Sequence, residues 1–199
     1  MRSGAVLALL FLMGCGSGMD WQSPWQIALD RLTAEPPAAT PGADALRAAL
    51  TPAAMAQIDV PVLLVQVPQR GAVAVMTRVA STRGVDTYMS GDSISISLRD
   101  GILIGTRGLG FDLMVADISA VAPAIAAGAG QGTRTHRYLD GEDQIRVVTY
   151  DCRYQRENDA VTEICDGGGL QFRNHYMGVR TVQWVSPRNG ALVIEWLKS

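Results

Sequence analysis

The sequence is poor in lysine and histidine. Lys198 is the only lysine of the 199 residues, so the other basic side chains are all arginines, and there are only two histidines. The formal net charge is -2 and no block of basic residues occurs, which excludes the nucleic-acid-binding class. Two explanations of the arginine bias stay open. One is genomic base composition, and the other is bidentate recognition of carboxylates or phosphates, for which arginine is better suited than lysine.

Long apolar runs are also missing. A helix that crosses a bilayer needs roughly 20 apolar residues, and the N-terminal run Ala5–Met13 is much shorter. The stretch Phe111–Ala127 is longer, but it contains Asp112, Asp117 and Pro123, which argue against a membrane segment. We expect it instead to form a short helix, around residues 112–127, that packs on a sheet.

The short N-terminal run ends in a motif typical of bacterial lipoproteins. Arg2 supplies the positive charge before the run, and Leu12-Met13-Gly14-Cys15 matches a lipobox. The sequence therefore predicts a signal peptide over residues 1–14, cleavage before Cys15, and lipidation of that thiol. The alternative is an ordinary secretory signal in which Cys15 is incidental. An Asp directly after the lipidated cysteine would favour retention in the inner membrane. Gly16 occupies this position and therefore favours the outer membrane of a Gram-negative cell.

Cysteines are scarce, and the three that occur suggest one disulfide. If Cys15 is lipidated, Cys152 and Cys165 remain as a pair in an oxidising compartment. A two-residue turn at residues 158–159 would set Cys152 directly opposite Cys165 in a hairpin, at a non-hydrogen-bonded position where Cα atoms lie closest. The rival interpretation, a metal site, lacks a nearby histidine.

The rest of the chain divides into a tether, a helical segment and a β-rich domain. Residues 15–22 are mostly small or polar and form the expected tether. Residues 23–59 contain one expected helix that starts at Ser23-Pro24 and a second from Asp44 to about Met55, interrupted at Thr51-Pro52. Residues 60–199 are rich in alternating apolar patterns separated by turn residues.

Within this domain, Ser93–Leu98 alternates strictly, so its Ile and Leu residues should face a core and its Ser residues face away. Asp100-Gly101 is a tight-turn signal. The expected strands are Pro61–Val67, Gly71–Ala80, Val85–Met89, Ser93–Leu98, Ile102–Ile104, Thr133–Leu139, Gln144–Tyr154, Leu170–Met177, Val179–Val185 and Ala191–Leu197. This series predicts a mainly β fold, a curved antiparallel sheet or partial β-barrel with a few short helices.

No catalytic pattern stands out. His136 and His175 are far apart in the sequence, and no Gly-x-Ser-x-Gly nucleophile motif occurs. The Gly-rich stretch 105–110 lacks the Lys-Ser/Thr of a phosphate-binding loop and the spacing of a dinucleotide fingerprint. We therefore predict no enzyme activity, no cofactor and no metal.

Two groups of residues are candidates for ligand binding. Arg134, His136 and Tyr138 alternate along one strand and should share a face, and Trp184 and Trp196 lie on the closing strands. Arginine with aromatic rings suits an acidic sugar polymer. The alternative is that the tryptophans belong to the core and the arginines are solvated.

Glu195 lies in an otherwise apolar strand. If it is buried, it needs a partner, for which we expect an arginine on a neighbouring strand.

Several motifs together resemble a known family. They are the lipobox, Gly91-Asp92 before the alternating strand, Arg99-Asp100-Gly101, the stretch Thr106–Leu113 and the Trp-rich C-terminal hairpin. Over roughly Val60–Ser199 the chain resembles the YjbF/GfcB (YmcC-like) family of lipoproteins. The resemblance implies a curved, partly closed antiparallel sheet, an outer-membrane lipoprotein that faces the periplasm, and a link to exopolysaccharide or group 4 capsule clusters. It implies no catalytic residues.

We therefore expect a lipid-anchored protein with a non-enzymatic binding or scaffolding role in exopolysaccharide or capsule assembly and export. Its expected partners are the outer-membrane bilayer and a polysaccharide or polysaccharide-export proteins. A carrier or chaperone for a hydrophobic ligand is the alternative, and an apolar cavity inside the sheet would favour it. A polysaccharide-modifying enzyme is a further alternative, which converging carboxylates in a cleft would favour.

Overall fold

A computed structural model describes residues 42–139 and 144–199 of the chain. The predicted signal peptide, Cys15, the tether and the helix expected after Ser23-Pro24 lie outside the described residues. Within the described part, no helix is both long enough and apolar enough to span a bilayer.

Two short helices open the described chain, α2 (Ala43–Ala49) and α3 (Pro52–Ala56). The break between them is where the sequence predicts it. The Thr51 hydroxyl accepts a hydrogen bond from the Ala54 N–H at 3.2 Å, and Pro52 occupies the first position of α3. Proline is tolerated there because that N–H has no partner within the helix.

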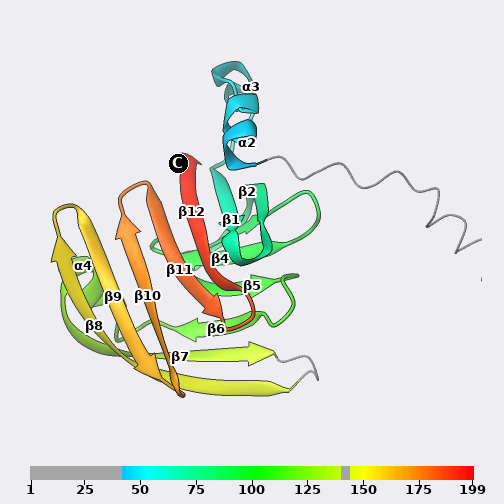
Figure 1. The fold of residues 1–199 in the computed structure, drawn as a ribbon. Helices are drawn as coiled ribbons and strands as arrows, with labels where there is room; N and C mark the ends of the chain where they lie inside the picture. Colours follow the sequence, from blue (N-terminus) through cyan, green and yellow to red (C-terminus); the bar gives the residue numbers. More distant parts are fainter. Residues whose placement is uncertain (1–41, 140–143) are drawn as a thin grey trace, which may run out of the picture. The chain divides into compact units, whose positions relative to one another are not determined.

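Twelve strands follow and form one antiparallel sheet (Figure 1). They are β1 (Val62–Val67), β2 (Ala72–Thr82), β3 (Val85–Met89), β4 (Ser95–Arg99), β5 (Ile102–Arg107), β6 (Leu113–Asp117), β7 (Ala129–Leu139), β8 (Ile145–Glu157), β9 (Ala160–Gly167), β10 (Leu170–Met177), β11 (Arg180–Ser186) and β12 (Gly190–Lys198). A single turn of 3₁₀ helix, η1 (Pro68–Arg70), links β1 to β2. The order β5-β4-β3-β2-β1-β12-β11-β10-β9-β8-β7-β6 is two meanders joined by the β1–β12 pair. The predicted fold class is confirmed.

The sheet curves until its two edge strands, β5 and β6, nearly meet. Side chains bridge this seam in place of a backbone ladder. The Arg107 guanidinium donates to the Leu113 carbonyl and to the Met114 carbonyl, each at 3.3 Å, and the Leu113 N–H donates to Thr106 Oγ1 at 3.0 Å. The result is a nearly closed barrel, which leaves no long exposed sheet edge at this position.

The helix expected around residues 112–127 is only partly present. Its first half is the edge strand β6, which pairs with β7, and only α4 (Ala122–Ala127) is helical. Leu113 and Ala116 are buried whereas Val115 is 44% exposed. The outward side of this strand is thus apolar too, which hides the alternation that would have identified a strand.

Side chains fill most of the barrel interior. The predicted alternation in β4 is confirmed, because Ile96 and Leu98 are buried in the core and the serines are on the other face. The predicted disulfide is also present: Cys152 and Cys165 are directly opposite in the β8–β9 ladder, with Cα atoms 4.1 Å apart. This crosslink ties together the two strands whose inward side chains lie under the candidate site.

Candidate functional site

A groove lies at one end of the barrel, with a volume of about 290 Å³. We call it the end groove. It is lined chiefly by Asp100 of the β4–β5 turn, Arg156 and Asp159 of the β8–β9 hairpin, Tyr176 and Met177 of β10, and Trp196 of β12. Aromatic rings and carboxylates thus come together from four separate parts of the chain.

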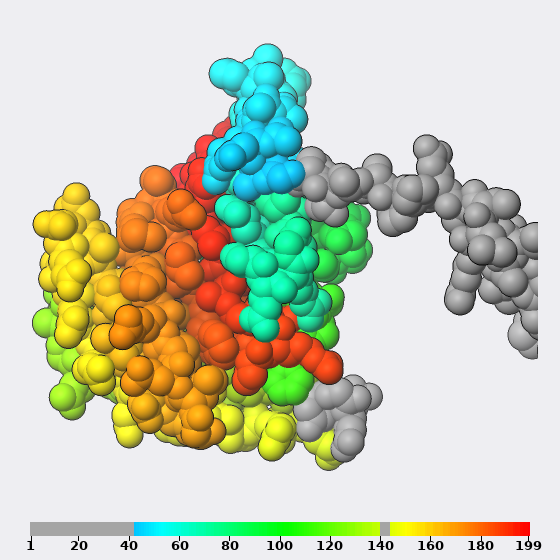
Figure 2. Space-filling model, viewed as in Figure 1, coloured from blue at the N-terminus to red at the C-terminus, as the bar shows by residue number. Residues whose placement is uncertain are grey.

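The groove exists because two neighbouring hairpins diverge at their tips. The β9–β10 ladder ends at the Val161–Tyr176 pair, beyond which the β8–β9 and β10–β11 turns are unpaired with each other. Figure 2 shows the notch between the two tips, where the yellow and orange segments separate. Met177 is 38% and Val179 is 69% exposed at the rim of this notch. A chain-like ligand could therefore enter from the side.

The β4–β5 turn is held against the groove from inside the barrel. Asp100 and Gly101 both have positive φ values, 50° and 77°, as a tight type I′ hairpin turn requires. The fully buried Gln183 of β11 reaches across the interior, donating to the Gly101 carbonyl at 2.8 Å and accepting from the Leu103 N–H at 2.7 Å. A Cβ at Gly101 would lie 3.7 Å from the Trp196 ring, so the β4–β5 turn lies directly beside that ring.

Under the groove, a buried carboxylate fixes Tyr176. Glu163 Oε2 accepts hydrogen bonds from Tyr176 Oη at 2.9 Å and from Asn174 Nδ2 at 2.5 Å. Its Oε1 accepts from Tyr154 Oη at 2.8 Å. The Arg134 guanidinium lies 3.3 Å from Glu163 Oε2 and also donates to Tyr176 Oη at 3.3 Å. Because every contact of this network is inside the barrel, Tyr176 has a fixed orientation in the groove wall.

The protonation states suit this network. Burial raises the pKa of Tyr176 and of Tyr154, so both phenols stay protonated and can donate. Burial lowers the pKa of Arg134, but the hydrogen bond to Tyr176 and the ion pair with Glu163 outweigh burial, so the net pKa lies above its ordinary value and the guanidinium stays charged. Burial, aided by Arg134, lowers the pKa of His136 well below its ordinary value, which makes that imidazole neutral.

Arg134, His136 and Tyr138 share one strand face, as predicted, but that face is the inner one. Their side chains are 1%, 0% and 2% exposed. Tyr138 Oη lies 2.8 Å from His136 Nδ1 and 3.2 Å from Tyr150 Oη. A polymer on the outer surface cannot contact these three residues, because the barrel wall separates them from it. These residues can contact only a molecule that enters the barrel interior. That they bind a ligand there stays a prediction.

The two tryptophans on the closing strands have different surroundings. Trp184 stacks on Phe172, with ring centroids 5.5 Å apart and an angle of 11° between the planes, and belongs to the core packing. Trp196 is partly buried and lines the end groove. Trp184 is therefore a core residue, as the alternative interpretation of the two tryptophans expects, whereas Trp196 remains a candidate for ligand contact.

The partner of Glu195 differs from the expected one. Its carboxylate is bound by Arg47 of helix α2, at 2.6 Å from Nη2 and 3.2 Å from Nε. Arg180 lies opposite Glu195 in the β11–β12 register, but the ion pair is made to the helix instead. Glu195 is on the outer face of β12, where α2 can reach it, so this contact attaches the N-terminal helix to the barrel.

Glu163, Asn174 and Gln183 are the important residues that sequence reasoning missed. The sequence does contain a signal for the inward direction of Glu163. This residue is two positions before Cys165, so its side chain must lie on the same face of the strand as the disulfide. Among the described residues, Cys152, Glu163 and Cys165 form one cluster of atoms that could ligate a metal. Its two sulfurs are joined in the disulfide, so it does not fit a metal ion.

Comparisons with known proteins agree with the fold. The family model described as "Group 4 capsule polysaccharide lipoprotein gfcB, YjbF" matches residues 43–197. The chain belongs to this YjbF/GfcB family. Among solved structures, the chain is similar to the crystal structure of the hypothetical lipoprotein YmcC from Escherichia coli (K12), with a TM-score of 0.61 and 12% sequence identity. The match covers 89% of this chain and 97% of the other, and at this identity it shows a shared fold alone. No curated protein matches the chain.

Proposed function

We propose that this lipoprotein binds a segment of a surface polysaccharide in the end groove, without altering it chemically, during capsule or exopolysaccharide assembly and export. The observation that carries the proposal is the placement of Trp196 and Tyr176 beside Asp100 and Asp159 in one groove. Family membership supplies the polysaccharide context, since the matching family is described as a capsule polysaccharide lipoprotein family.

The groove offers what a sugar ring needs. A sugar has an apolar face that packs on an aromatic ring and an edge of hydroxyl groups that donate to carboxylates. Trp196 can supply the first contact, and Asp100 and Asp159 the second. A volume of about 290 Å³ lies at the lower limit of small-molecule pockets, which suits one sugar unit of a longer chain.

The charge of the groove favours neutral sugar units over acidic ones. Two carboxylates face a single guanidinium, and Arg156 already donates to the Ala126 carbonyl at 3.0 Å. An acidic sugar would be repelled by the two aspartates. The expected ligand therefore differs from the acidic sugar polymer that the combination of arginine with aromatic residues predicts.

Binding is favoured over catalysis because neither groove aspartate is positioned by a neighbour. Asp100 and Asp159 are exposed, and within the described residues no side-chain hydrogen bond or ion pair holds either of them. A glycosidase needs two carboxyl groups held at a defined separation, one of them protonated. The buried Glu163, which is well positioned, is 0% exposed and already accepts from three donors.

The proposed location is the outer membrane, facing the periplasm, with the anchor on Cys15. The disulfide supports an oxidising compartment. The lipobox and Gly16 support lipid attachment and outer-membrane sorting.

The test is a binding titration of neutral capsule-type oligosaccharides with the full chain. Trp196→Leu should reduce the affinity about tenfold or more, because the flat aromatic face on which the sugar ring packs is lost while an apolar side chain remains. Trp184→Leu is the matched control: it loses the same ring in the core and should leave affinity unchanged in folded protein. Equal losses in both variants, or no binding by the parent chain, would contradict the proposal.

A further inference from the structure

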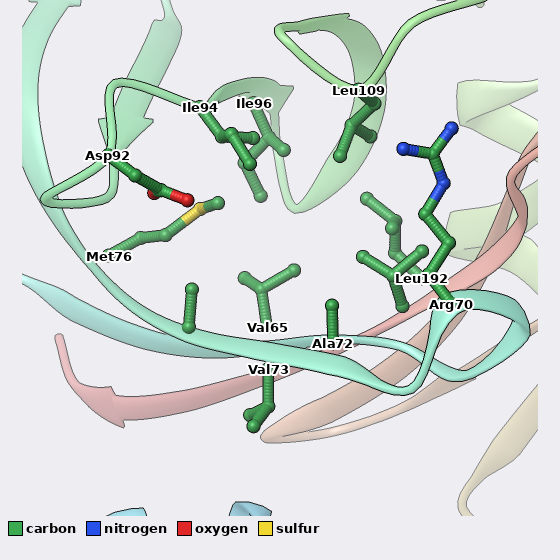
Figure 3. Close-up of a pocket in the computed structure, with 12 residues that line it drawn as sticks. Val65, Arg70, Ala72, Val73, Met76, Asp92, Ile94, Ile96, Leu109 and Leu192 are labelled. Atoms are coloured by element: carbon green, nitrogen blue, oxygen red, sulfur yellow. The ribbon is translucent and has the colours of Figure 1, made fainter. Parts of the chain in front are cut away.

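A second site candidate lies at the opposite end of the barrel. Consecutive turns of an antiparallel meander alternate between its two ends, so the β1–β2 and β3–β4 turns lie away from the β4–β5 turn of the end groove. Between those turns there is a cavity of about 200 Å³. Figure 3 shows its wall, which consists mainly of Val65, Met76, Ile94, Ile96, Leu109 and Leu192.

The wall can accept only an apolar group. None of the six side chains can form an ordinary hydrogen bond, so a sugar or a peptide placed there would lose its hydrogen bonds to water without replacement. An alkyl chain has no such loss. A dry cavity of about 150 Å³ holds a benzene molecule, so a cavity of this size holds roughly eight carbon atoms of a single chain.

The rim of the cavity carries one charge of each sign. Arg70 is exposed on η1, and within the described residues its guanidinium has no hydrogen-bond or ion-pair partner. Asp92 lies on the β3–β4 turn and accepts a hydrogen bond from the Ser90 hydroxyl. Figure 3 shows Arg70 and Asp92 on opposite sides of the apolar wall. A headgroup with a negative and a positive charge is complementary to both in the sign of its charges.

We propose that this cavity binds the alkyl chain of a zwitterionic single-chain phospholipid, with the phosphate at Arg70 and the ammonium group at Asp92. The cavity is too small for two chains, and its rim complements neither a purely anionic nor a purely cationic headgroup. The proposal does not depend on polysaccharide binding, because the two sites share no residue.

The first test is chain-length dependence. Alkylphosphocholines of four to twelve carbons are titrated into the full chain carrying Cys15→Ser, so that the protein itself bears no acyl group. Each added methylene should increase the affinity about fourfold, up to roughly eight carbons, with little gain beyond because the cavity is then filled. The Met76 methyl signal in NMR spectra, assigned with Met76→Leu, should shift on saturation. Absence of saturable binding, or shifts at Trp196 in place of Met76, would overturn the proposal.

Two neighbouring residues of β2 provide matched variants. Both residues line the cavity, but the Ala72 side chain points into it, whereas the Val73 side chain points to the other side of the strand (Figure 3). Ala72→Leu should abolish octylphosphocholine binding by filling the space, and Val73→Leu should leave it unchanged. Ala72 is exposed at the rim, so the larger side chain should be compatible with folding. Undiminished binding in Ala72→Leu would overturn the assignment of this cavity.

The headgroup is tested with octyl amphiphiles of different charge. Arg70→Gln and Asp92→Asn should each weaken octylphosphocholine binding roughly three- to tenfold, as expected for the loss of a partly solvated charged partner. Octyl glucoside should bind more weakly to the parent chain and be insensitive to both substitutions. Tighter binding of octyl sulfate than of octylphosphocholine, or no effect of either substitution, would overturn the zwitterionic assignment.

Discussion

Arg134 of β7 and Glu163 of β9 form an ion pair in the barrel interior, 3.3 Å apart and with 1% and 0% of their side chains exposed. The two strands are not neighbours, since β8 lies between them. Tyr154 of β8 completes the carboxylate's contacts on the intervening strand. This pair therefore links three strands and holds Tyr176 in the wall of the end groove.

Replacing the carboxylate should be costly. Glu163→Gln keeps the shape but leaves the Arg134 charge buried without a counterion, and we expect a loss of about 3–5 kcal/mol in the free energy of unfolding. Urea denaturation measures it. Glu157→Gln, an exposed position at the end of β8, is the control and should change stability by less than about 0.5 kcal/mol. A loss below about 1 kcal/mol in Glu163→Gln would mean that the pair is not energetically important.

The disulfide should contribute to stability by restricting the unfolded chain. Cys152 and Cys165 are 13 residues apart, for which the chain-entropy treatment gives about 3 kcal/mol. The double variant Cys152→Ala/Cys165→Ala should therefore unfold at a lower urea concentration than the oxidised parent. The reduced parent should behave similarly to the double variant. If oxidised and reduced parent protein unfold together, the bridge does not stabilise the native barrel.

The Arg47–Glu195 contact should make a small, pH-dependent contribution. The hydrogen bond from Arg47 lowers the pKa of Glu195 from its ordinary value of 4.5. A depressed carboxyl pKa in the folded state stabilises the protein above the unfolded-state value and is lost as the pH falls through the folded-state value. Glu195→Gln should thus reduce stability at pH 7, by less than about 1 kcal/mol because the pair is partly exposed.

This difference between Glu195→Gln and the parent chain should begin to decrease as the pH falls below about 4.5 and should disappear below the folded-state pKa of Glu195. Asp44→Asn serves as the control, because Asp44 also contacts Arg47 but its side chain is fully exposed. A difference between Glu195→Gln and parent that is the same at pH 3 and pH 7 would contradict an electrostatic origin.

The anchor prediction concerns Cys15, which lies outside the described residues. Mass spectrometry of protein from the membrane fraction should find a chain that begins at Cys15 and carries acyl groups. Cys15→Ser should move the protein from the membrane to the soluble fraction, because acyl chains contribute about 0.8 kcal/mol per buried methylene. A mature chain that begins elsewhere without lipid would refute the lipobox.

Much of this fold could be predicted from the sequence because strands and turns have local signals. Asp100-Gly101 and the alternation in Ser93–Leu98 located a hairpin, and the pairing from residues 158–159 gave the Cys152–Cys165 register. The strand Leu113–Asp117 was mistaken for helix because both of its faces are apolar. Such a strand has no period-2 signal, and only its pairing with β7 identifies it.

The candidate site was less accessible to sequence reasoning. Trp196 was identified as a ligand-binding candidate, but its neighbours Asp100, Asp159 and Tyr176 come from turns and strands distant in the sequence. The direction of a strand face, inward or outward, depends on barrel closure. This is why Arg134, His136 and Tyr138 were correctly placed on one face, whereas burial of that face was not foreseen.

The most direct test of the account is to map the polysaccharide contact on the whole chain by NMR. Backbone and tryptophan indole signals are followed while a neutral capsule-type oligosaccharide is added. We expect the shifts to concentrate at Asp100, Asp159, Met177 and Trp196, with Trp184 and the cavity residue Met76 unaffected. Shifts confined to another surface, or none at saturating oligosaccharide, would contradict it.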